Sequence, residues 1–518
     1  MAQIITADEA AALVPDGATV ALSGFGLACV NEETMAAVER RFLATGAPHG
    51  LHVVHASAVG NRRDKGMSHW GHPGLVRRWM GGIAIASPAF AQLISEDAVE
   101  AYNLPQGVIT QLYREIAAHR PGVITKVGLG TFVDPRVEGA RMSARTTEDY
   151  VQVVELAGEE WLLYPSFPIQ VGLIRGTVAD TRGNLTLSKE GLKMEVLPIA
   201  QAVHNSGGVV IAQVESVAEA GSLDPNDVTV PGLLVDYLVV SEPENHFQTE
   251  NTHYNPSFSG QLRVPLSSVA SIPLGERKVI ARRAAMELRR GAVLNLGVGI
   301  PCDVGSVAAE EGVSDLVLGT TEAGAVGGVP AGLQDFGHSW NPEALVDHHA
   351  QFDFYDGGGL DVAVLGLAQT DAHGNVNVSK FGSRVAGCGG FINISQSART
   401  LVFAGTFTAG GLETEVRDGT LRIVTEGRAR KFLADVEQIT FSGAVATKAG
   451  QRVLYVTERA VLELRDGRMT VTEIAPGIDL QRDVLDLMDF VPDVAADLRT
   501  MPAGLFSETW GGLADLVG

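Results

Sequence analysis

Glu322 is the residue of this chain whose surroundings in the sequence best suit covalent chemistry. It follows two threonines in the glycine-rich segment TTEAGAVGGVP (residues 320–330). Lys and Arg are absent from residues 291–379, so no cation that is near in sequence neutralises its charge. The glycines after it let a backbone or a ligand approach closely, because they carry no side chain. Such a carboxylate can act as a nucleophile or a base, although a surface acid in a flexible loop has the same pattern.

A second element that could do chemistry is NLGVGIP (295–301), where a predicted strand ends in Gly-x-Gly and Pro301 could begin a helix. Proline fits the first helical turn because the amides there have no partner within the helix. Those free amides can hold a phosphate or a developing oxyanion. A dinucleotide-binding turn is the competing interpretation, but the position of its third glycine holds Cys302.

The segment VAGCGGFINIS (385–395) is a third glycine-rich element. Its glycines could form a second concavity lined by amides, although the pattern alone predicts only a glycine turn before a strand. Cys388 within it could be a nucleophile, but no partner base can be assigned. We therefore interpret it as a structural cysteine.

Histidines occur in two groups that invite a metal interpretation. Residues 347–356 contain two adjacent histidines and three aspartates, yet adjacent residues of an extended segment point to opposite faces. No HExxH or cysteine-based spacing is present, so we predict no metal site. His69 and His72, with two arginines nearby, indicate an anion site or a subunit contact.

These residues must be positioned by the surrounding secondary structure, and the sequence predicts a repeating order of strand, glycine turn and helix. Strands are predicted over 18–26 and 292–299, and amphipathic helices over 109–119 and 279–291. This alternation is typical of an α/β fold with largely parallel sheets.

The two halves of the chain also resemble each other. Residues 6–26 and 278–299 share the order helix, glycine turn, buried strand and Gly-x-Gly. Residues 173–191 and 364–382 share an apolar strand, an Asp-x-x-Gly-Asn turn, a short strand and Ser-Lys-x-Gly. Two matched segments in the same order predict two homologous α/β domains, with the active site in the cleft between them.

The repeat fixes approximate domain boundaries. We expect an N-terminal domain over residues 1–265 and a C-terminal domain over 279–518. The proline-containing segment 266–278 is the predicted linker.

Composition excludes several classes of function. Asp and Glu number 61 against 39 Lys and Arg, and the net charge of −22 disfavours nucleic acids and anionic membranes as partners. Three cysteines are too few for a disulfide framework, which indicates a reducing compartment. With no apolar stretch of membrane-spanning length, we expect a soluble cytoplasmic protein.

These segments together resemble a family I coenzyme A transferase. The resemblance rests on the Glu322 segment, GVGIP, AGCGGFINIS and the two related halves, and it extends over essentially the whole chain. Further matching segments are SGFG (23–26), AYNLPQGVITQLYREIAA (101–118) and QFDFYDGGGLDVAVLG (351–366). The chain is most similar to the single-chain acetate/propionate type, which is similar to the 3-oxoacid CoA-transferases.

The resemblance implies a mechanism without metal or cofactor, in which coenzyme A enters only as a thioester substrate. Glu322 would attack an acyl-CoA, a mixed anhydride would form, and a glutamyl-CoA thioester would remain until an acceptor acid reverses the steps by ping-pong kinetics. Gln106 would contact the substrate carboxylate, and Phe25 and Gly26 would line the same site. The implied oxyanion and CoA contacts are the amides of Gly297, Val298, Gly299, Ile300, Gly387, Gly389 and Gly390.

Substrates and partners follow from the same resemblance. Acyl-CoA and small carboxylic acids are the expected partners, with exchange between short-chain acids such as acetate and propionate. Relatives form dimers or tetramers, so a homodimer or homotetramer is expected. Two alternatives stay open: an acyl-CoA hydrolase that uses the same glutamate with water as acceptor, and a non-catalytic binding module on the same scaffold.

Overall fold

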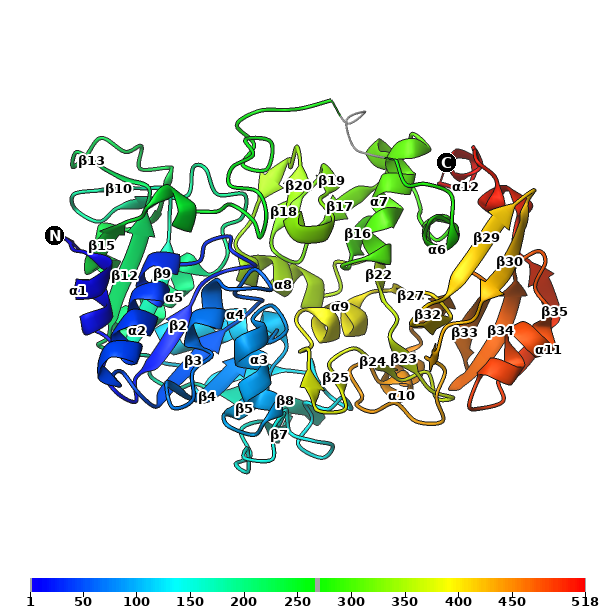
Figure 1. The fold of residues 1–518 in the computed structure, drawn as a ribbon, viewed down its shortest axis with the longest axis horizontal. Coiled ribbons are helices and arrows are strands. Elements are labelled where there is room, and N and C mark those ends of the chain that lie inside the picture. The colour runs from blue at the N-terminus through cyan, green and yellow to red at the C-terminus, as the bar shows by residue number, and fades with distance from the viewer. Residues whose placement is uncertain (1, 266–270, 518) are drawn as a thin grey trace.

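Two α/β halves of the chain lie side by side in the computed structural model, which describes residues 2–265 and 271–517 (Figure 1). The N-terminal half occupies the left of the view and the C-terminal half the right. Each half has its own hydrophobic core, built around a sheet whose central strands are buried on both faces. This arrangement confirms the predicted α/β class and the two-domain organisation.

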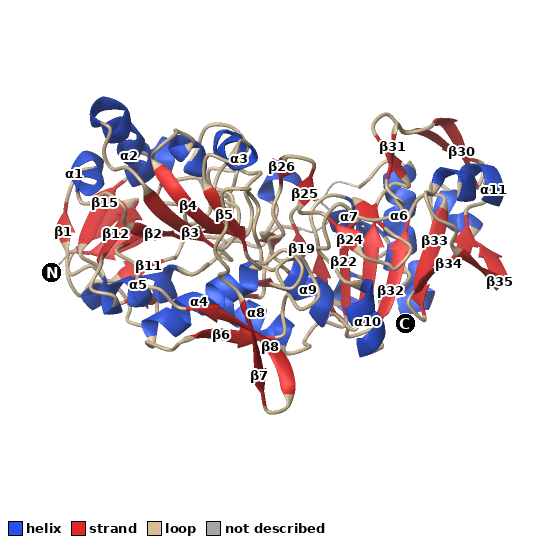
Figure 2. Cartoon of the chain, turned by 90° about the horizontal axis from the view of Figure 1, so that it is seen from below, coloured by secondary structure: helices blue, strands red, loops and turns tan. Residues whose placement is uncertain are grey.

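The N-terminal half is built on an eight-stranded sheet in which every neighbouring pair is parallel. Parallel strands covered on both faces are continuous apolar runs, as in TVAL of β2. Figure 2 shows helices α1, α2 and α3 on one face of this sheet and α4 and α5 on the other. In spatial order the strands are β1 (Gln3–Ile4), β15 (Tyr237–Val240), β12 (Val209–Val214), β9 (Val171–Arg175), β2 (Thr19–Leu22), β3 (Leu51–His55), β4 (Val76–Gly81) and β5 (Glu100–Asn103).

The C-terminal half contains a ten-stranded sheet whose central five strands are parallel. Their order, β17-β16-β22-β27-β32, corresponds to β3-β2-β9-β12-β15 of the first half. In spatial order the strands are β21 (Ala344–Leu345), β18 (Ala325–Val326), β17 (Leu318–Thr320), β16 (Val293–Leu296), β22 (Val362–Gly366), β27 (Thr400–Ala404), β32 (Arg452–Val456), β33 (Ala460–Arg465), β34 (Arg468–Ile474) and β35 (Asp493–Thr500).

The predicted repeat is confirmed at the level of single hydrogen bonds. In the first Asp-x-x-Gly-Asn turn, Asn184 donates its backbone and side-chain N–H groups to Asp180 over 3.0 and 2.9 Å. In the second, Asn375 donates in the same way to Asp371 over 3.1 and 2.9 Å. Each turn joins a pair of short antiparallel strands, so the two halves share this local structure as well as their strand order.

Helices connect the strands and cover the sheets. The predicted linker 266–278 overlaps α6, which begins at Glu276, while residues 266–270 lie outside the described part of the chain; the domain boundaries therefore stay predictions. Among the described residues no helix has the length and apolar character needed to cross a membrane. The helices are α1 (Ala7–Ala12), α2 (Glu32–Thr45), α3 (Pro88–Ser95), α4 (Gln106–Ala117), α5 (Val196–Asn205), α6 (Glu276–Ala285), α7 (Ile300–Glu310), α8 (His348–Asp356), α9 (Phe391–Ser397), α10 (Gly443–Ala449), α11 (Leu480–Asp483) and α12 (Leu513–Val517).

Smaller sheets complete both halves. The hairpin of β7 and β8 projects from the N-terminal half in Figure 2 and pairs with β6. The remaining strands are β6 (Gly122–Thr125), β7 (Gln152–Leu156), β8 (Glu159–Pro165), β10 (Val178–Asp180), β11 (Leu185–Thr186), β13 (Ser216–Ala218), β14 (Val228–Val230), β19 (Val329–Pro330), β20 (Ser339–Trp340), β23 (Gln369–Thr370), β24 (Val376–Asn377), β25 (Lys380–Phe381), β26 (Arg384–Val385), β28 (Thr408–Ala409), β29 (Glu413–Arg417), β30 (Thr420–Thr425) and β31 (Ala429–Arg430).

Candidate active site

Glu322 stands at the carboxyl end of β17, the edge of a parallel sheet at which ligands usually bind. A tight turn follows the strand: the Gly324 amide donates to the Thr321 carbonyl over 3.0 Å, and the Thr321 hydroxyl donates to the Gly337 carbonyl over 2.8 Å. Gly324 has a φ of 104° and lies so close to the Val346 carbonyl that an added Cβ would be 2.3 Å from that oxygen. Only glycine fits there, and the turn therefore fixes the direction of Glu322.

The carboxylate of Glu322 has no counter-charge in the part of the chain that the structure describes. Within the described residues the structure shows no ion pair and no hydrogen bond to it, although the side chain is half-buried. Burial alone raises the pKa of Glu322 from its ordinary value of 4.5 to about 7. The absence of Lys and Arg near Glu322 in the sequence therefore corresponds to the absence of an ion pair with Glu322 among the described residues.

Gly390 forms the surface against which this carboxylate lies. A Cβ added at Gly390 would be 2.2 Å from Oε2 of Glu322 and 3.1 Å from the ring of Phe352. Gly390 is the N-terminal capping residue of α9, and its amide donates to no acceptor among the described residues. This amide is thus a candidate donor to an oxyanion formed beside Glu322.

The N-terminal half contributes Gln106, the first residue of α4, to the region around Glu322 and Gly390. Its side chain is fully buried, and its backbone amide donates to the Gly389 carbonyl over 2.9 Å. Its Oε1 atom lies 3.5 Å from the position that a Cβ of Gly389 would take. Glu322 and Gln106, which come from different halves, therefore face two consecutive glycines.

The contact between the halves around this point is made by backbone groups. Gly389 donates to the Gly82 carbonyl over 2.9 Å, and Ala84 donates to the Ala386 carbonyl over 3.0 Å. The side-chain oxygen of Asn103 accepts from the Cys388 amide over 2.8 Å. Because backbone atoms approach this closely, added Cβ atoms would lie 2.4 Å from the Gly82 carbonyl oxygen at Gly387 and 2.8 Å from Ile83 at Gly389.

Comparison with known proteins identifies the family to which this chain belongs. A model of the Coenzyme A transferase family matches residues 4–241. The chain is 53% identical to the caffeate CoA-transferase of Acetobacterium woodii over 100% of each chain, and 42% identical to the acetate CoA-transferase YdiF of Escherichia coli K12 over 97% of this chain and 95% of that one. The chain belongs to the coenzyme A transferase family.

A solved structure of a relative agrees with the fold of this CoA-transferase. The acyl-CoA transferase YdiF of Escherichia coli O157:H7, in a thioester complex with CoA, matches with a TM-score of 0.93 at 40% identity. The match covers 99% of this chain and 97% of that one. A two-domain α/β enzyme that transfers coenzyme A between an acyl-CoA and a carboxylic acid is therefore established at the level of the family.

Three of the amides expected to bind an oxyanion or CoA are engaged elsewhere in this CoA-transferase. Gly297 donates to the Val364 carbonyl over 2.8 Å, as part of the sheet edge. Gly387 donates to the Ser379 carbonyl over 3.1 Å, and Gly389 donates to the carbonyl of Gly82. These amides cannot donate to a ligand in this structure.

The other predicted donors of the GVGIP turn are free of such contacts. The amides of Val298 and Gly299 have no acceptor among the described residues, and Ile300 begins α7, where the first amides have no partner within the helix. Pro301 is therefore the second residue of the helix. The role of this turn in binding CoA stays a prediction.

Phe25 and Gly26 lie in different surroundings. An added Cβ at Gly337 would be 2.7 Å from the Phe25 ring, and Gly337 is the residue that accepts the Thr321 hydroxyl hydrogen bond next to the nucleophile candidate. Gly26 instead faces Glu250, at 2.7 Å from an added Cβ. Phe25 thus supports the loop of Glu322, while no contact among the described residues brings Gly26 to that loop.

The cysteines do not compete with Glu322 as nucleophiles. Burial, together with nearby Asp303 and Glu322, raises the pKa of the Cys302 thiol to about 12. Burial also raises the pKa of Cys388, whose thiol donates to the Leu104 carbonyl over 3.5 Å. The predicted strand after Cys388 is wrong, because the chain continues into helix α9.

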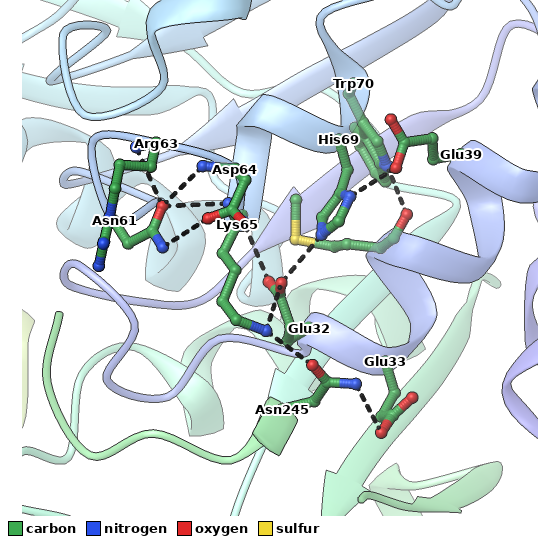
Figure 3. A network of polar contacts seen from close by, with 12 residues as sticks. Glu32, Glu33, Glu39, Asn61, Arg63, Asp64, Lys65, His69, Trp70 and Asn245 are labelled. Carbon is green, nitrogen blue, oxygen red and sulfur yellow. Dashed lines mark hydrogen bonds and ion pairs between the residues drawn. The ribbon is translucent and has the colours of Figure 1, made fainter. Parts of the chain in front are cut away.

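His69 belongs to a separate polar network (Figure 3), and His72 contacts the same network through Glu39. The two ring nitrogens of His69 lie 2.6 Å from a Glu39 oxygen and 2.9 Å from a Glu32 oxygen, and His72 lies 2.7 Å from Glu39. Carboxylates thus occupy the positions that an anion would need, so the predicted anion site is wrong. Among the described residues no group of three or more His, Cys, Asp or Glu is arranged to hold a metal ion.

His348 and Glu195 form a buried contact with the candidate site residue Gln106 that the sequence did not reveal. His348 entered the sequence analysis only as a possible metal ligand, and it instead lies between Glu195 and Gln106. Phe352, one turn along α8, lies against Gly390 and so borders the same place. Glu195 comes from the first half and carries no sequence motif that could have identified it.

Proposed function

We propose that this CoA-transferase exchanges coenzyme A between short-chain acyl-CoA and free acids through a thioester on Glu322. The observation that carries the proposal is the half-buried carboxylate of Glu322, which lies against Gly390 without a counter-charge. A neighbouring cation would weaken such a nucleophile, whereas burial without a partner keeps it reactive.

The steps balance without an outside reagent. One Glu322 oxygen attacks the acyl carbonyl carbon, the C–S bond breaks, and CoA thiolate leaves a mixed anhydride of the acid and Glu322. The thiolate then attacks the glutamyl carbonyl carbon, so the acid leaves as its carboxylate and glutamyl-CoA remains. A second acid attacks this thioester, and the same steps in reverse give the new acyl-CoA and free Glu322.

Each attack creates a tetrahedral oxyanion that needs hydrogen-bond donors. The free amide of Gly390 is a candidate donor beside Glu322, and one such donor is typically worth about 3 kcal/mol of transition-state stabilisation. The amides of Val298 and Gly299 are further candidates on the GVGIP turn, where they would also contact CoA. Gln106 is proposed to bind the carboxylate of the acid from the side of the first half.

The choice of acid separates two candidate substrate classes. Acetate, and with it the short-chain class, is supported by the 42% identical acetate CoA-transferase, and an aromatic acid by the 53% identical caffeate CoA-transferase. A panel of acyl-CoA donors, each assayed against acids other than its own from the set acetate, propionate, butyrate, lactate, acetoacetate and caffeate, distinguishes them by kcat/KM. Highest values for short acids support the proposal, and highest values for caffeate replace it with the aromatic class.

A covalent test addresses the mechanism directly. After incubation with acyl-CoA, borohydride should reduce the glutamyl thioester to an alcohol, and peptide mapping should place this change at Glu322. Glu322→Ala should abolish both the label and transfer, and Glu322→Asp should be severely impaired, because its carboxylate is about one methylene short. A label on another residue, or full activity of the alanine variant, would refute the assignment.

Kinetics distinguish transfer from hydrolysis. Parallel initial-rate lines at several acceptor concentrations are expected for a ping-pong transferase. Release of free acid and CoA at a comparable rate without any acceptor acid would instead identify a hydrolase that uses the same glutamate.

A further inference from the structure

A buried chain of three polar side chains crosses between the two halves at the proposed acid site. Glu195 Oε2 lies 2.7 Å from His348 Nδ1, and His348 Nε2 lies 2.8 Å from Gln106 Nε2. Glu195 and Gln106 belong to the first half and His348 to the second. All three side chains are completely buried, so water does not substitute for any of these contacts.

The backbone holds each member of this chain in place. Glu195 is the capping residue that precedes α5, and the amide of His348, the first residue of α8, donates to the Met194 carbonyl over 3.2 Å. The ring of His348 packs on Phe352 with centroids 5.4 Å apart. His348 therefore has little freedom to turn away from Gln106.

The hydrogen positions in this chain follow from its contacts. Because the Gln106 amide nitrogen always donates, the facing Nε2 of His348 must accept, and its Nδ1–H then donates to Glu195. In this arrangement the Oε1 atom of Gln106 is buried and has no hydrogen-bond partner among the described residues. The unpartnered oxygen lies over Gly389, next to the glycine that faces the Glu322 carboxylate.

An unpartnered carbonyl oxygen repels a carboxylate, whereas the proposed acid site requires a donor. A half-turn of the terminal amide would exchange the two ends of Gln106. Its oxygen would then accept from Nε2–H of His348, and both of its N–H groups would be available for the acid. The arrangement thus has two states, which differ in whether His348 Nε2 carries hydrogen.

We propose that Glu195 and His348 are a positioning pair, which sets which end of the Gln106 amide faces the acid. With hydrogen on Nε2 of His348, Gln106 donates to the carboxylate of the acid; with hydrogen on Nδ1 alone, Gln106 presents its oxygen. This inference rests on the proposed function, in which Gln106 contacts the acid. His348 and Glu195 touch no reacting atom and act only through Gln106.

His348→Asn tests the contact, because the Asn amide takes the place of Nδ1 but cannot reach Gln106. We expect the KM for the acceptor acid to rise about tenfold, as for one lost hydrogen bond, with the KM for acyl-CoA within twofold of the wild-type value. His348→Gln places an amide near the position of Nε2 and should recover most of the acceptor KM. The matched control is His349→Asn, because the next residue of α8 is half-buried and its side chain makes no hydrogen bond among the described residues.

A double-mutant cycle separates positioning from a general structural role. Gln106→Ala should raise the acceptor KM, and adding His348→Asn to it should change that KM by less than twofold, because the partner is already absent. Additive effects, or equal increases in both KM values, would overturn the inference. If His348→Asn does not fold, Glu195→Gln, which keeps the shape of the side chain, takes its place in the cycle with the same expectations.

The same data distinguish this inference from the proposed function. If Gln106→Ala leaves the acceptor KM unchanged while Glu322 is still labelled by acyl-CoA, the acid contact and the positioning pair are both wrong, but the glutamyl-CoA mechanism stands. If Glu322 is not labelled, the mechanism is wrong whatever the cycle shows.

Discussion

Replacing Gly390 with alanine should disable the nucleophile while leaving the fold intact. Gly390 has a φ of −80°, which alanine adopts without strain, so the consequences come from space alone. The new Cβ would be 2.2 Å from Oε2 of Glu322, whereas ordinary contact begins near 3.4 Å. The carboxylate must therefore move by about 1.2 Å, because backbone hydrogen bonds around Gly389 fix the loop on the other side.

A displacement of about 1 Å in a reacting group typically costs about 100-fold in rate, or about 2.7 kcal/mol. We therefore expect the kcat of the Gly390→Ala enzyme to fall by about that factor in a CoA-transfer assay with acetyl-CoA. Gly332→Ala is the matched control. Gly332 also caps a helical turn at negative φ, and an added Cβ there meets nothing within 4 Å.

Thermal unfolding of both variants shows whether the loss is local. A small decrease in Tm is expected for each, because alanine is a poorer helix cap than glycine. If the Gly390→Ala enzyme keeps a kcat within threefold of the wild type at a similar Tm, then Glu322 does not lie against Gly390 during the reaction and the site geometry proposed above is wrong.

Three further predictions concern charge and stability. Burial raises the pKa of Glu322 to about 7 in the folded protein, so its charged form destabilises the fold. This cost is absent below pH 4.5, grows as pH rises and is complete above pH 7. Glu322→Gln should therefore have a higher Tm than the wild type at pH 8, with the difference vanishing near pH 4.5. Burial opposes the charge of His69, but hydrogen bonds to two glutamates outweigh it and raise its pKa, so His69→Gln should lose about 2 kcal/mol of unfolding free energy at pH 6 and much less at pH 9, measured by urea titration. Arg175→Ala should lose about 3–5 kcal/mol of unfolding free energy, because it removes the guanidinium that lies 2.6 Å from the buried Glu190 carboxylate and leaves only His246 and the Cys29 thiol beside that charge; unfolding at an unchanged denaturant midpoint would contradict this.

The sheet strands were predictable because their physical signature is local. The strand predicted over 18–26 contains β2 (Thr19–Leu22), and that over 292–299 contains β16 (Val293–Leu296). Strands buried on both faces require continuous apolar runs, and those runs stand out against glycine turns. The ends of the helices were predicted less exactly. Helix α6 runs from Glu276 to Ala285, so it begins before the predicted range 279–291 and ends within it.

The site was predictable only where its chemistry lies in one segment. Glu322 could be singled out because the absence of nearby cations is itself a sequence property. The part played by Gly387 and Gly389 could not, because their partners Gly82 and Ile83 are about three hundred residues away and the same glycines serve equally well for binding or for packing. His348 was missed for the same reason.

The glycines at residues 387–390 therefore have a divided role, which follows from where the nucleophile lies. Glu322 belongs to the second half, yet Ala323 and Cys388 beside it are buried in the hydrophobic core of the first. Gly387 and Gly389 allow that contact, because a side chain at Gly387 would clash with the backbone of the first half, and one at Gly389 would crowd the Ile83 side chain. Gly390 alone is left to face the carboxylate. The proposed nucleophile is thus placed by the contact between the halves, and any change that shifts one half against the other should lower kcat before it unfolds either.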